Sequence, residues 1–377
     1  MAPMRLGIII LSANLGSWAA AAYLPYLLSR HGKAHYKIVA LCNSSVESAH
    51  STIKTFGLPS DTRAYGDPSD LAQDANIDLV VCSTRVDRHY ETIKPSISAG
   101  KAVFVEWPLA SNISQVRGLA SLARMQNIKC VVGLQGPVTA PINGVRKLLE
   151  DGLIGKVLSS DMKSWGGTGN HNAVPESLRY FTQIAVGGNA ITIGFGHLWE
   201  FLQYALGDTY DIRSKLQLQR PKVGLTSKTG VMVGTVESDV PDLVSVSALL
   251  RPSQYIENGA TVFITFHRGP PFPGEPNLTW TISGEKGELK FTAEGGTTPR
   301  TMASGAIKIE LHDFSTGMVR DIPWAWEPWR QELPIAARGV AGVYEAYARG
   351  DQTAYCDFEH GLKRHEQLEN ILSRRDY

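Results

Sequence analysis

The sequence predicts an α/β protein with two domains: a doubly wound parallel sheet over residues 1–135, and an α+β domain with an open, largely antiparallel sheet over residues 136–377. Three observations support this division. The length of 377 residues exceeds that of most single domains. Up to Gln135, apolar strand-like runs alternate with helix-like runs through short connections. Beyond Gln135, strand-like runs follow one another in series, which is typical of antiparallel sheets.

Composition and charge exclude several classes of function. The chain is 43% apolar and 19% charged, as ordinary globular proteins are, and its net charge of +1 without a basic block argues against direct nucleic-acid binding. No apolar run approaches the length of a membrane span. The four cysteines form no C-x-x-C pair, which predicts free thiols and a cytoplasmic protein. The ten histidines show no metal-ligand spacing, so no metal site is expected.

The apolar runs of the first domain are bounded by turn residues. Leu6–Leu11 is better explained as a first strand than as a signal peptide, because small residues and then a helix-like run follow it. Glycines end most of the helix-like runs. The predicted strands are Leu6–Leu11, Lys37–Cys42, Asp78–Ser83, Ala102–Val105 and Lys129–Leu134. The predicted helices are Trp18–His31, Ser45–Phe56, Asp67–Gln73, His89–Ala99 and Ser114–Gln126.

The second domain begins with helical patterns and continues as strands. Trp165–Glu176 is a polar, glycine-rich loop between them. The predicted helices are Pro141–Asp151, Leu178–Ile184, Asn189–Leu206, Gln331–Arg349 and Asp357–Arg374. The predicted strands are Val157–Ser164, Arg213–Leu218, Leu243–Leu250, Ala260–His267, Leu278–Ile282, Glu288–Phe291 and Ala306–Leu311.

The strand Ala102–Val105 shows where a binding site is expected. Its apolar run stops at Glu106 and Trp107, and Pro108 cannot continue a central strand. Glu106 and Trp107 therefore lie at the carboxyl edge of the sheet, where open α/β sheets bind ligands. Gln135, just beyond the fifth strand, is placed at the same edge.

The turn after the first strand is the candidate pyrophosphate site. A strict G-x-G-x-x-G is absent, but Ser12, Asn14 and Gly16 are small or polar, and Trp18 opens the following helix. A plain structural turn is the alternative. The position of the turn between the first strand and the first helix favours a nucleotide.

The ends of the second and third strands extend the candidate cofactor site. Asn43 and Ser44 occupy the place where a carboxylate usually binds the ribose hydroxyls. Because no carboxylate would repel a 2′-phosphate, the sequence favours NADP(H) over NAD(H). Thr84, Arg85 and His89 suit a phosphate or ribose, although His89 could equally just begin a helix.

The second domain offers candidates for substrate binding and proton transfer. Trp165 and His171 flank glycines in a loop that suits a small-molecule pocket, with a solvated loop as the alternative. His197 follows Gly194 and Gly196 in a helical run, where a buried, hydrogen-bonded histidine is the competing interpretation.

Several runs together resemble a known family. The strand Leu6–Leu11 with its turn, the segment Val103–Pro108, Gly133-Leu134-Gln135 and Gly187–His197 resemble the glucose-fructose oxidoreductase and inositol dehydrogenase family (Gfo/Idh/MocA) over nearly the whole chain. The runs His89-Tyr90-Glu91 and Phe195-Gly196-His197 with Leu202-Gln203-Tyr204 further resemble its branch of fungal galactose-regulon repressors. The resemblance implies an N-terminal Rossmann domain and a second domain whose open sheet covers the nicotinamide and often mediates dimerisation.

The resemblance also implies an atypical catalytic site. Family dehydrogenases have a lysine in Glu-Lys-Pro, where this chain has Trp107, and an aspartate where it has Ile193. His197 is the remaining proton-handling residue, and Tyr180 or the Trp165–His171 loop would assist it. A tryptophan cannot replace a lysine as an acid, but it can stack on a flat ring.

Two functions compete on this basis. The first is an NAD(P)H-dependent oxidoreductase, expected to be a homodimer, for a small carbonyl, imine or sugar-like substrate. The second is a dinucleotide-binding regulator that binds a transcription activator without catalysis. The lack of obvious long insertions for partner binding favours the enzyme.

Overall fold

The computed structural model describes residues 2–14, 17–296 and 306–373 and divides into two compact units. The first unit combines Met1–Val138 with Glu327–His365, and the second combines Thr139–Trp326 with Glu366–Tyr377. The chain thus leaves the first unit near the expected boundary at Gln135 but later returns to it. The assignment of a cofactor role to residues 1–135 and a substrate role to residues 136–377 stays a prediction.

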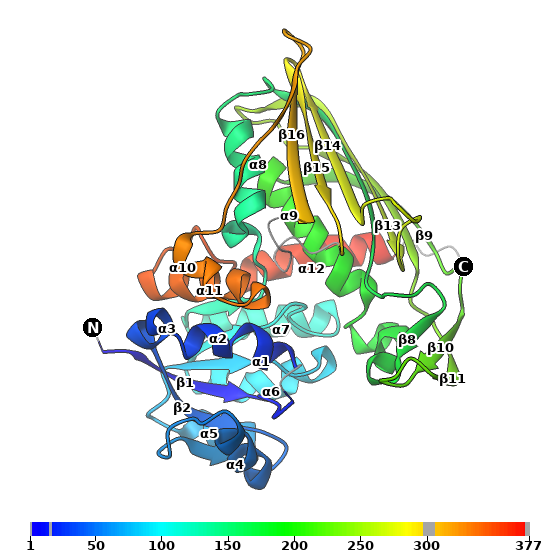
Figure 1. The fold of residues 1–377 in the computed structure, drawn as a ribbon. Coiled ribbons are helices and arrows are strands. Elements are labelled where there is room, and N and C mark those ends of the chain that lie inside the picture. The colour runs from blue at the N-terminus through cyan, green and yellow to red at the C-terminus, as the bar shows by residue number, and fades with distance from the viewer. Residues whose placement is uncertain (1, 15–16, 297–305, 374–377) are drawn as a thin grey trace. The chain divides into compact units, whose positions relative to one another are not determined.

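A six-stranded sheet forms the first unit, in the order β3-β2-β1-β4-β5-β6. Figure 1 labels its strands β1 and β2. All neighbouring strands are parallel, which confirms the predicted doubly wound sheet. The strand order reverses between β1 and β4, the point where such sheets bind ligands at their carboxyl edge. The strands are β1 Met4–Ile9, β2 Tyr36–Cys42, β3 Arg63–Tyr65, β4 Leu79–Cys82, β5 Ala102–Val105 and β6 Cys130–Val132.

Three short helices replace the single helix predicted over Trp18–His31. They are α1 Trp18–Ala22, α2 Leu24–Leu27 and α3 Arg30–His35. Pro25 has no N–H to donate to the preceding turn, and Ser29 is extended, with φ −70° and ψ 167°. Gly32 does not stop the helix as expected but lies within α3, where a Cβ atom would stand 2.0 Å from the carbonyl oxygen of Tyr26.

The remaining helices of the first unit flank its sheet, and one of them completes its core. They are α4 Val46–Thr55, α5 Pro68–Gln73, α6 Val86–Ser98, α7 Ile113–Met125, the 3₁₀ turn η1 Gly136–Val138, α10 Pro328–Gln331 and α11 Ile335–Arg349. Helix α12, Phe358–Leu372, contributes residues to both units. Tyr344 of α11 is buried in the same apolar cluster as Leu6 and Phe104, and Tyr36 donates a hydrogen bond to its carbonyl oxygen at 2.6 Å. The core of the Rossmann unit therefore depends on α11.

An eight-stranded sheet forms the second unit, in the order β17-β16-β15-β14-β7-β13-β12-β9. Only the β7–β13 pair is parallel among its described pairs, which confirms the largely antiparallel prediction. A separate small sheet has the order β11-β10-β8. The strands are β7 Val157–Gly166, β8 Ala173–Pro175, β9 Thr209–Gln217, β10 Lys222–Thr226, β11 Met232–Glu237, β12 Leu243–Leu250, β13 Ile256–Arg268, β14 Leu278–Gly284, β15 Gly287–Ala293, β16 Ile307–Asp313 and β17 Val319–Asp321.

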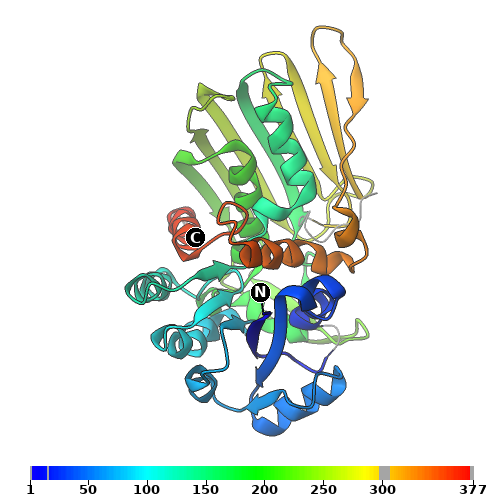
Figure 2. The same ribbon diagram turned by 90° about the vertical axis from the view of Figure 1, so that its left-hand side faces the viewer.

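Helices cover one face of the large sheet (Figures 1 and 2). They are α8 Ala140–Glu150 and α9 Gly196–Leu206, with a π-helical segment, η4 Ala190–Phe195, preceding α9. Two 3₁₀ segments, η2 Glu176–Thr182 and η3 Ile184–Val186, stand in place of the helix predicted over Leu178–Ile184. Phe195 packs edge-on against Phe266 of β13 and stacks with Trp199. The side chains of Phe263 and its neighbours on the opposite face stay accessible, with Phe263 52% exposed.

Across the described residues, no helix is both long and apolar enough to cross a membrane. The four cysteines are free: Cys42, Cys82 and Cys356 are buried and Cys130 is half-buried. Burial raises the pKa of the Cys42 thiol to about 12 and that of Cys82 to about 11. These thiols therefore stay protonated and unreactive at neutral pH.

Candidate functional site

The carboxyl edge of the parallel sheet brings the proposed cofactor-binding residues together. Because all six strands run in parallel, the segments that follow β1, β2, β4, β5 and β6 meet at one edge. Of these residues, Gly16 lies outside the described part of the chain. The others are Ser12, Asn14, Trp18, Asn43, Ser44, Thr84, Arg85, His89, Glu106, Trp107 and Gln135.

Asn43 holds the turn after β1 in place. Its Oδ1 accepts a hydrogen bond from the Leu11 N–H at 3.2 Å, and its Nδ2 donates to the Leu11 carbonyl at 3.1 Å. Nδ2 also donates to the Thr52 hydroxyl at 3.0 Å, and the residue is 6% exposed. The side chain of Asn43 is therefore used within the unit, whereas Ser44 beside it is exposed.

Glu106 accepts hydrogen bonds from the first helix. The Trp18 Nε1–H donates to Glu106 Oε1 at 2.9 Å, and the hydroxyl of Tyr23 donates to the same oxygen. Burial and the carboxylate raise the pKa of Tyr23 well above its ordinary value, so this phenol stays a donor. A Cβ at Gly133 would lie 2.6 Å from Glu106 Oε2, which explains why a glycine stands there. The carboxylate thus fixes Trp18 against β5.

His89 and His365 hold together the loops after β4 and β5. The two ring nitrogens of His89 lie 2.9 Å from the Pro108 carbonyl oxygen and 3.0 Å from that of Thr84. The Leu109 N–H donates to His365 Nε2 at 3.0 Å, and the ring of Trp107 lies 4.4 Å from that of His365. Burial lowers the pKa of both histidines, that of His365 to about 3. His89 and Trp107 are therefore packed inside the unit.

Gln135 is also buried, and its Nε2 donates to the Gly133 carbonyl at 2.7 Å. The residues that remain accessible at the edge are Ser12, Asn14, Ser44, Thr84 and Arg85. Arg85 makes a bidentate pair with Asp87, with both N–O distances at 2.6 Å. The edge thus offers hydroxyl, amide and guanidinium groups to a ligand.

A cavity of about 460 Å³ lies within the second unit, between the loop after β7 and the π-helical segment. None of its described lining residues is charged. It is lined by Gly166, Gly167, Thr168, Gly169, Phe181, Asn189, Ala190, Ile193, Gly194, Pro270, Asn277, Gly295 and Gly296.

Asn189 begins the π-helical segment and is fully buried. Its Oδ1 accepts hydrogen bonds from the Ile191 and Thr192 N–H groups at 2.9 and 3.0 Å. The Thr192 hydroxyl accepts in return from the Asn189 N–H at 3.0 Å, which completes a reciprocal cap. The Asn189 Nδ2 has no hydrogen-bond partner among the described residues.

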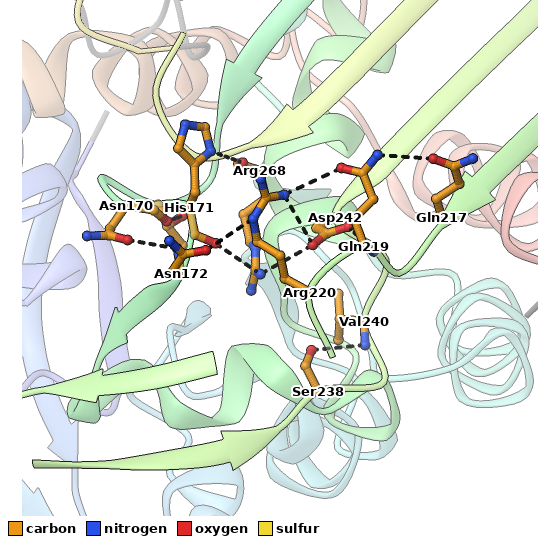
Figure 3. Close-up of polar contacts among 11 residues, drawn as sticks. Asn170, His171, Asn172, Gln217, Gln219, Arg220, Ser238, Val240, Asp242 and Arg268 are labelled. Carbon is orange, nitrogen blue, oxygen red and sulfur yellow. Dashed lines mark hydrogen bonds and ion pairs between the residues drawn. The ribbon is translucent and has the colours of Figure 1, made fainter. Parts of the chain in front are cut away.

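A buried polar cluster fixes the loop that carries the predicted substrate residue His171 (Figure 3). Arg268 at the end of β13 donates to the His171 carbonyl at 3.3 Å, and His171 Nδ1 lies 3.2 Å from the Arg268 carbonyl oxygen. The Arg268 guanidinium pairs with the buried Asp242 at 3.4 Å, while Arg220 lies 3.8 Å from the same carboxylate. His171 therefore anchors the loop and does not line the cavity.

The other predicted residues of the second unit are not among those that line the cavity. Trp165 stacks on His267 at 5.2 Å, with the Lys163 ammonium 4.7 Å from the indole ring. His197 is 1% exposed in α9, and its ring stacks on Phe201 at 6.2 Å. Tyr180 is half-buried next to Phe181.

Sequence reasoning identified the glycine loop and the Gly187–His197 run but missed the side chains that line the cavity. Asn189 had a detectable signal, because an asparagine directly before a helical run is a typical cap. Phe181, Pro270 and Asn277 had none, since they reach the cavity from segments far apart in the sequence.

Comparisons with known proteins show what the two parts of the chain are similar to. Residues 15–134 match the model described as oxidoreductase family, NAD-binding Rossmann fold, and residues 141–293 match that of the Gal80p C-terminal domain. The chain is 28% identical to dehydrogenase aclE of Aspergillus oryzae, over 98% of this chain and 95% of the relative. It is also 28% identical to the galactose/lactose metabolism regulatory protein GAL80 of Saccharomyces cerevisiae, over 78% of this chain and 68% of the relative.

Solved structures show the same fold. A super-repressor mutant of Gal80p from Saccharomyces cerevisiae superposes with a TM-score of 0.86 at 22% identity, covering 99% of this chain and 96% of that one. An NAD binding oxidoreductase from Klebsiella pneumoniae gives 0.77 at 20% identity, with 99% and 96% covered.

The fold and the two matched domains define an NAD-binding Rossmann protein with a Gal80-like second domain. These matches confirm the resemblance to the Gfo/Idh/MocA oxidoreductase family, close to its Gal80-like branch, that was seen in the motifs.

Proposed function

We propose that the protein is an NAD(P)H-dependent oxidoreductase for a small carbonyl, imine or sugar-like compound. The observation that carries the proposal is the set of accessible hydroxyl, amide and guanidinium groups at the carboxyl edge of the β3-β2-β1-β4-β5-β6 sheet. A separate uncharged cavity in the second unit supports a small-molecule substrate. The curated dehydrogenase relative and the NAD-binding family model support the same activity.

The residues at the edge fit a dinucleotide. The Ser17 hydroxyl, at the start of α1, is buried and has no hydrogen-bond partner among the described residues, so a donor is left over where the pyrophosphate would lie. Ser12 and Asn14 would contact the phosphates, Ser44 the adenosine ribose, and Thr84 with Arg85 the central part of the cofactor. A bound nicotinamide would supply the hydride.

His197, assisted by Tyr180, is the proposed proton-handling residue. An imidazole can donate a proton to, or accept one from, a carbonyl oxygen or an amine. We expect His197→Gln to lower kcat by about 10²–10⁴-fold while the affinity for NADP(H) changes little. Tyr180→Phe should lower kcat less. Steady-state kinetics and calorimetry check this, and an unaltered kcat in the His197 variant would remove it from catalysis.

NADP(H) is the proposed cofactor. The exposed Ser44 follows β2, and no carboxylate stands at residues 43–45 to repel a 2′-phosphate. Calorimetry should show saturable binding of NADP(H). Ser44→Asp should weaken NADP(H) binding at least about tenfold while NAD(H) binding is kept, because the new carboxylate repels the phosphate and suits free ribose hydroxyls.

A matched control carries the same charge elsewhere. Ser51→Asp lies on the exposed side of α4 and should leave both affinities unchanged. Binding of neither cofactor to the wild-type protein would end the dinucleotide proposal. Equal effects of the two variants would place the ribose away from the end of β2.

A regulator without catalysis is the second candidate function, and the match of residues 141–293 to the Gal80p C-terminal domain favours it. Its partner would be a transcription activator. Incubation of the protein and NADPH with a panel of carbonyls and imines separates the two functions. Tight cofactor binding without turnover of any compound would favour the regulator.

The proposed assembly is a homodimer formed through the uncovered face of the eight-stranded sheet. This face carries mainly serine, threonine and charged side chains around the exposed Phe263. The proposed location is the cytoplasm, which the four free cysteines support.

A further inference from the structure

We propose that the cavity of the second unit selects an uncharged, ring-sized carbonyl compound, whose oxygen accepts a hydrogen bond from Asn189 Nδ2. This inference rests on the proposed function, since it names the class of substrate. It stands on four features of the cavity: an unused buried donor, the absence of charge, its size, and the unusual backbone that forms its wall.

The hydrogen bonds that cap the π-helical segment fix the orientation of the Asn189 amide. Asn189 Oδ1 already accepts from the Ile191 and Thr192 N–H groups, so the orientation of the amide follows from this network. The Nδ2 group is therefore held on the other side, buried and without a partner among the described residues. Buried donors in folded proteins are nearly always satisfied, so a ligand acceptor is the expected partner.

The other polar side chains of the wall are already used. The Thr168 hydroxyl donates to the Asn170 carbonyl at 2.7 Å. Asn277 Nδ2 donates to the Trp165 carbonyl at 3.1 Å, and its Oδ1 accepts from the Gly295 N–H at 2.9 Å. Asn189 Nδ2 is thus the donor group without any hydrogen-bond partner among the polar side chains of the described lining residues.

The remaining wall excludes ions and suits a ring. Phe181, Ile193 and Pro270 present apolar surface, and no described lining side chain carries a charge to balance an ionic ligand. The volume of about 460 Å³ falls in the range of small-molecule sites. The cavity therefore suits a compound with one ring, which contacts the apolar wall, and one strong acceptor, which binds Asn189 Nδ2.

The backbone of the wall is also unusual. Gly167 has φ +78°, and a Cβ there would lie 2.6 Å from that of Ala190. The glycine loop can therefore approach the π-helical segment closely. Segments of π-helix are rare and frequently mark functional sites.

The variant Asn189→Asp tests the donor directly. Aspartate keeps an acceptor for the two capping N–H groups but replaces the amide donor by a carboxylate oxygen. Cyclohexanone serves as the probe, with cyclohexylamine and cyclohexanecarboxylate as charged rings of the same size, and ligand-observed NMR titration gives the affinities. We expect the wild-type protein to bind cyclohexanone at least tenfold more tightly than either ion. Asn189→Asp should weaken cyclohexanone binding at least tenfold. It should also lower Tm, because a carboxylate replaces a fully buried amide, so the titration is made well below the Tm of the variant.

Asn170→Asp is the matched control. Asn170 is exposed, its Oδ1 accepts from the Asn172 N–H at 2.7 Å, and it does not line the cavity. Asn170→Asp introduces the same negative charge in the loop after β7 and should leave cyclohexanone binding unchanged.

Three results would overturn the inference: tighter binding of an ion than of the ketone, no binding of cyclohexanone, or equal affinities for the wild-type and Asn189→Asp proteins. None of these involves NADPH or turnover. The proposed oxidoreductase fails separately, if no dinucleotide binds or no carbonyl is turned over, and the cavity would then still select the neutral ring.

Discussion

At the level of single residues, Glu106, a predicted cofactor contact, makes hydrogen bonds within its own unit. Its carboxylate accepts from Trp18 and Tyr23 and is 8% exposed. We expect Glu106→Gln to lower the free energy of unfolding by about 1–3 kcal/mol, since the half-buried Trp18 and the buried Tyr23 lose a charged acceptor. Urea unfolding measures the change. Glu47→Gln, on the exposed start of α4, is the control and should change little.

Because His365 is buried in its neutral form, we expect the stability of the first unit to fall at low pH. Burial lowers its pKa to about 3, against an ordinary value near 6.5, and burial also lowers that of His89. The unfolded chain therefore binds protons that the folded unit does not, and stability falls as the pH drops from about 6.5 toward 3. For His365 alone, the full loss of stability is on the order of 5 kcal/mol.

His365→Gln isolates this contribution. Glutamine keeps an acceptor for the Leu109 N–H but does not titrate. We expect the variant to lose less stability than the wild-type protein between pH 6.5 and pH 4 in urea unfolding. Parallel pH profiles for the two proteins would contradict this assignment.

At the level of elements, an ion pair between the residue before β12 and the last residue of β13 holds the loop at residues 166–172. Asp242 is fully buried and pairs with Arg268, which in turn binds the His171 carbonyl. Removing the carboxylate leaves a buried guanidinium without its ion-pair partner. Asp242→Ala should therefore lower the free energy of unfolding by about 3–5 kcal/mol. Hydrogen exchange should show faster opening of the loop.

A double-mutant cycle provides the control for this pair. The variant with both Asp242→Ala and Arg268→Met should be less unstable than the sum of the two single changes, with a coupling above about 1 kcal/mol. Additive losses in urea unfolding would mean that the two side chains act independently.

The strong apolar runs of the sequence predicted most of the elements. β5 and β12 were placed at their observed bounds because uninterrupted apolar or alternating patterns define them. β3 was missed since its three half-buried residues carry no such pattern. The first helix was predicted too long because the combined effect of Pro25 and Ser29 depends on the packing around them.

The candidate site was predictable at its edge but not in its cavity. Parallel strands bring their carboxyl ends together, so a list of strand ends is also a list of neighbours. The sequence could not show that Glu106 and His89 bind other parts of their own unit. Likewise, Phe181 and Asn277 come together through tertiary packing, which has no local sequence signal.

At the level of the whole molecule, the uncovered sheet face provides a test of assembly. We expect Phe263→Asp to convert a dimer into a monomer, because it places a charge at the centre of the proposed interface. Sedimentation velocity measures the change. Tm measured at low concentration should stay near that of the wild type, since the side chain is 52% exposed. Thr281→Asp, on the half-buried side of β14, tests whether the interface extends along the sheet.

The split of the first unit between Met1–Val138 and Glu327–His365 affects its synthesis. When the ribosome has made the first segment, the apolar surface that later covers Tyr344 is still without α11. The intervening chain emerges next, and its large sheet can form before the earlier segment is complete. A nascent chain stopped before Ile335 should therefore expose the surface that α11 buries and bind chaperones there, although every strand of its parallel sheet has already been made.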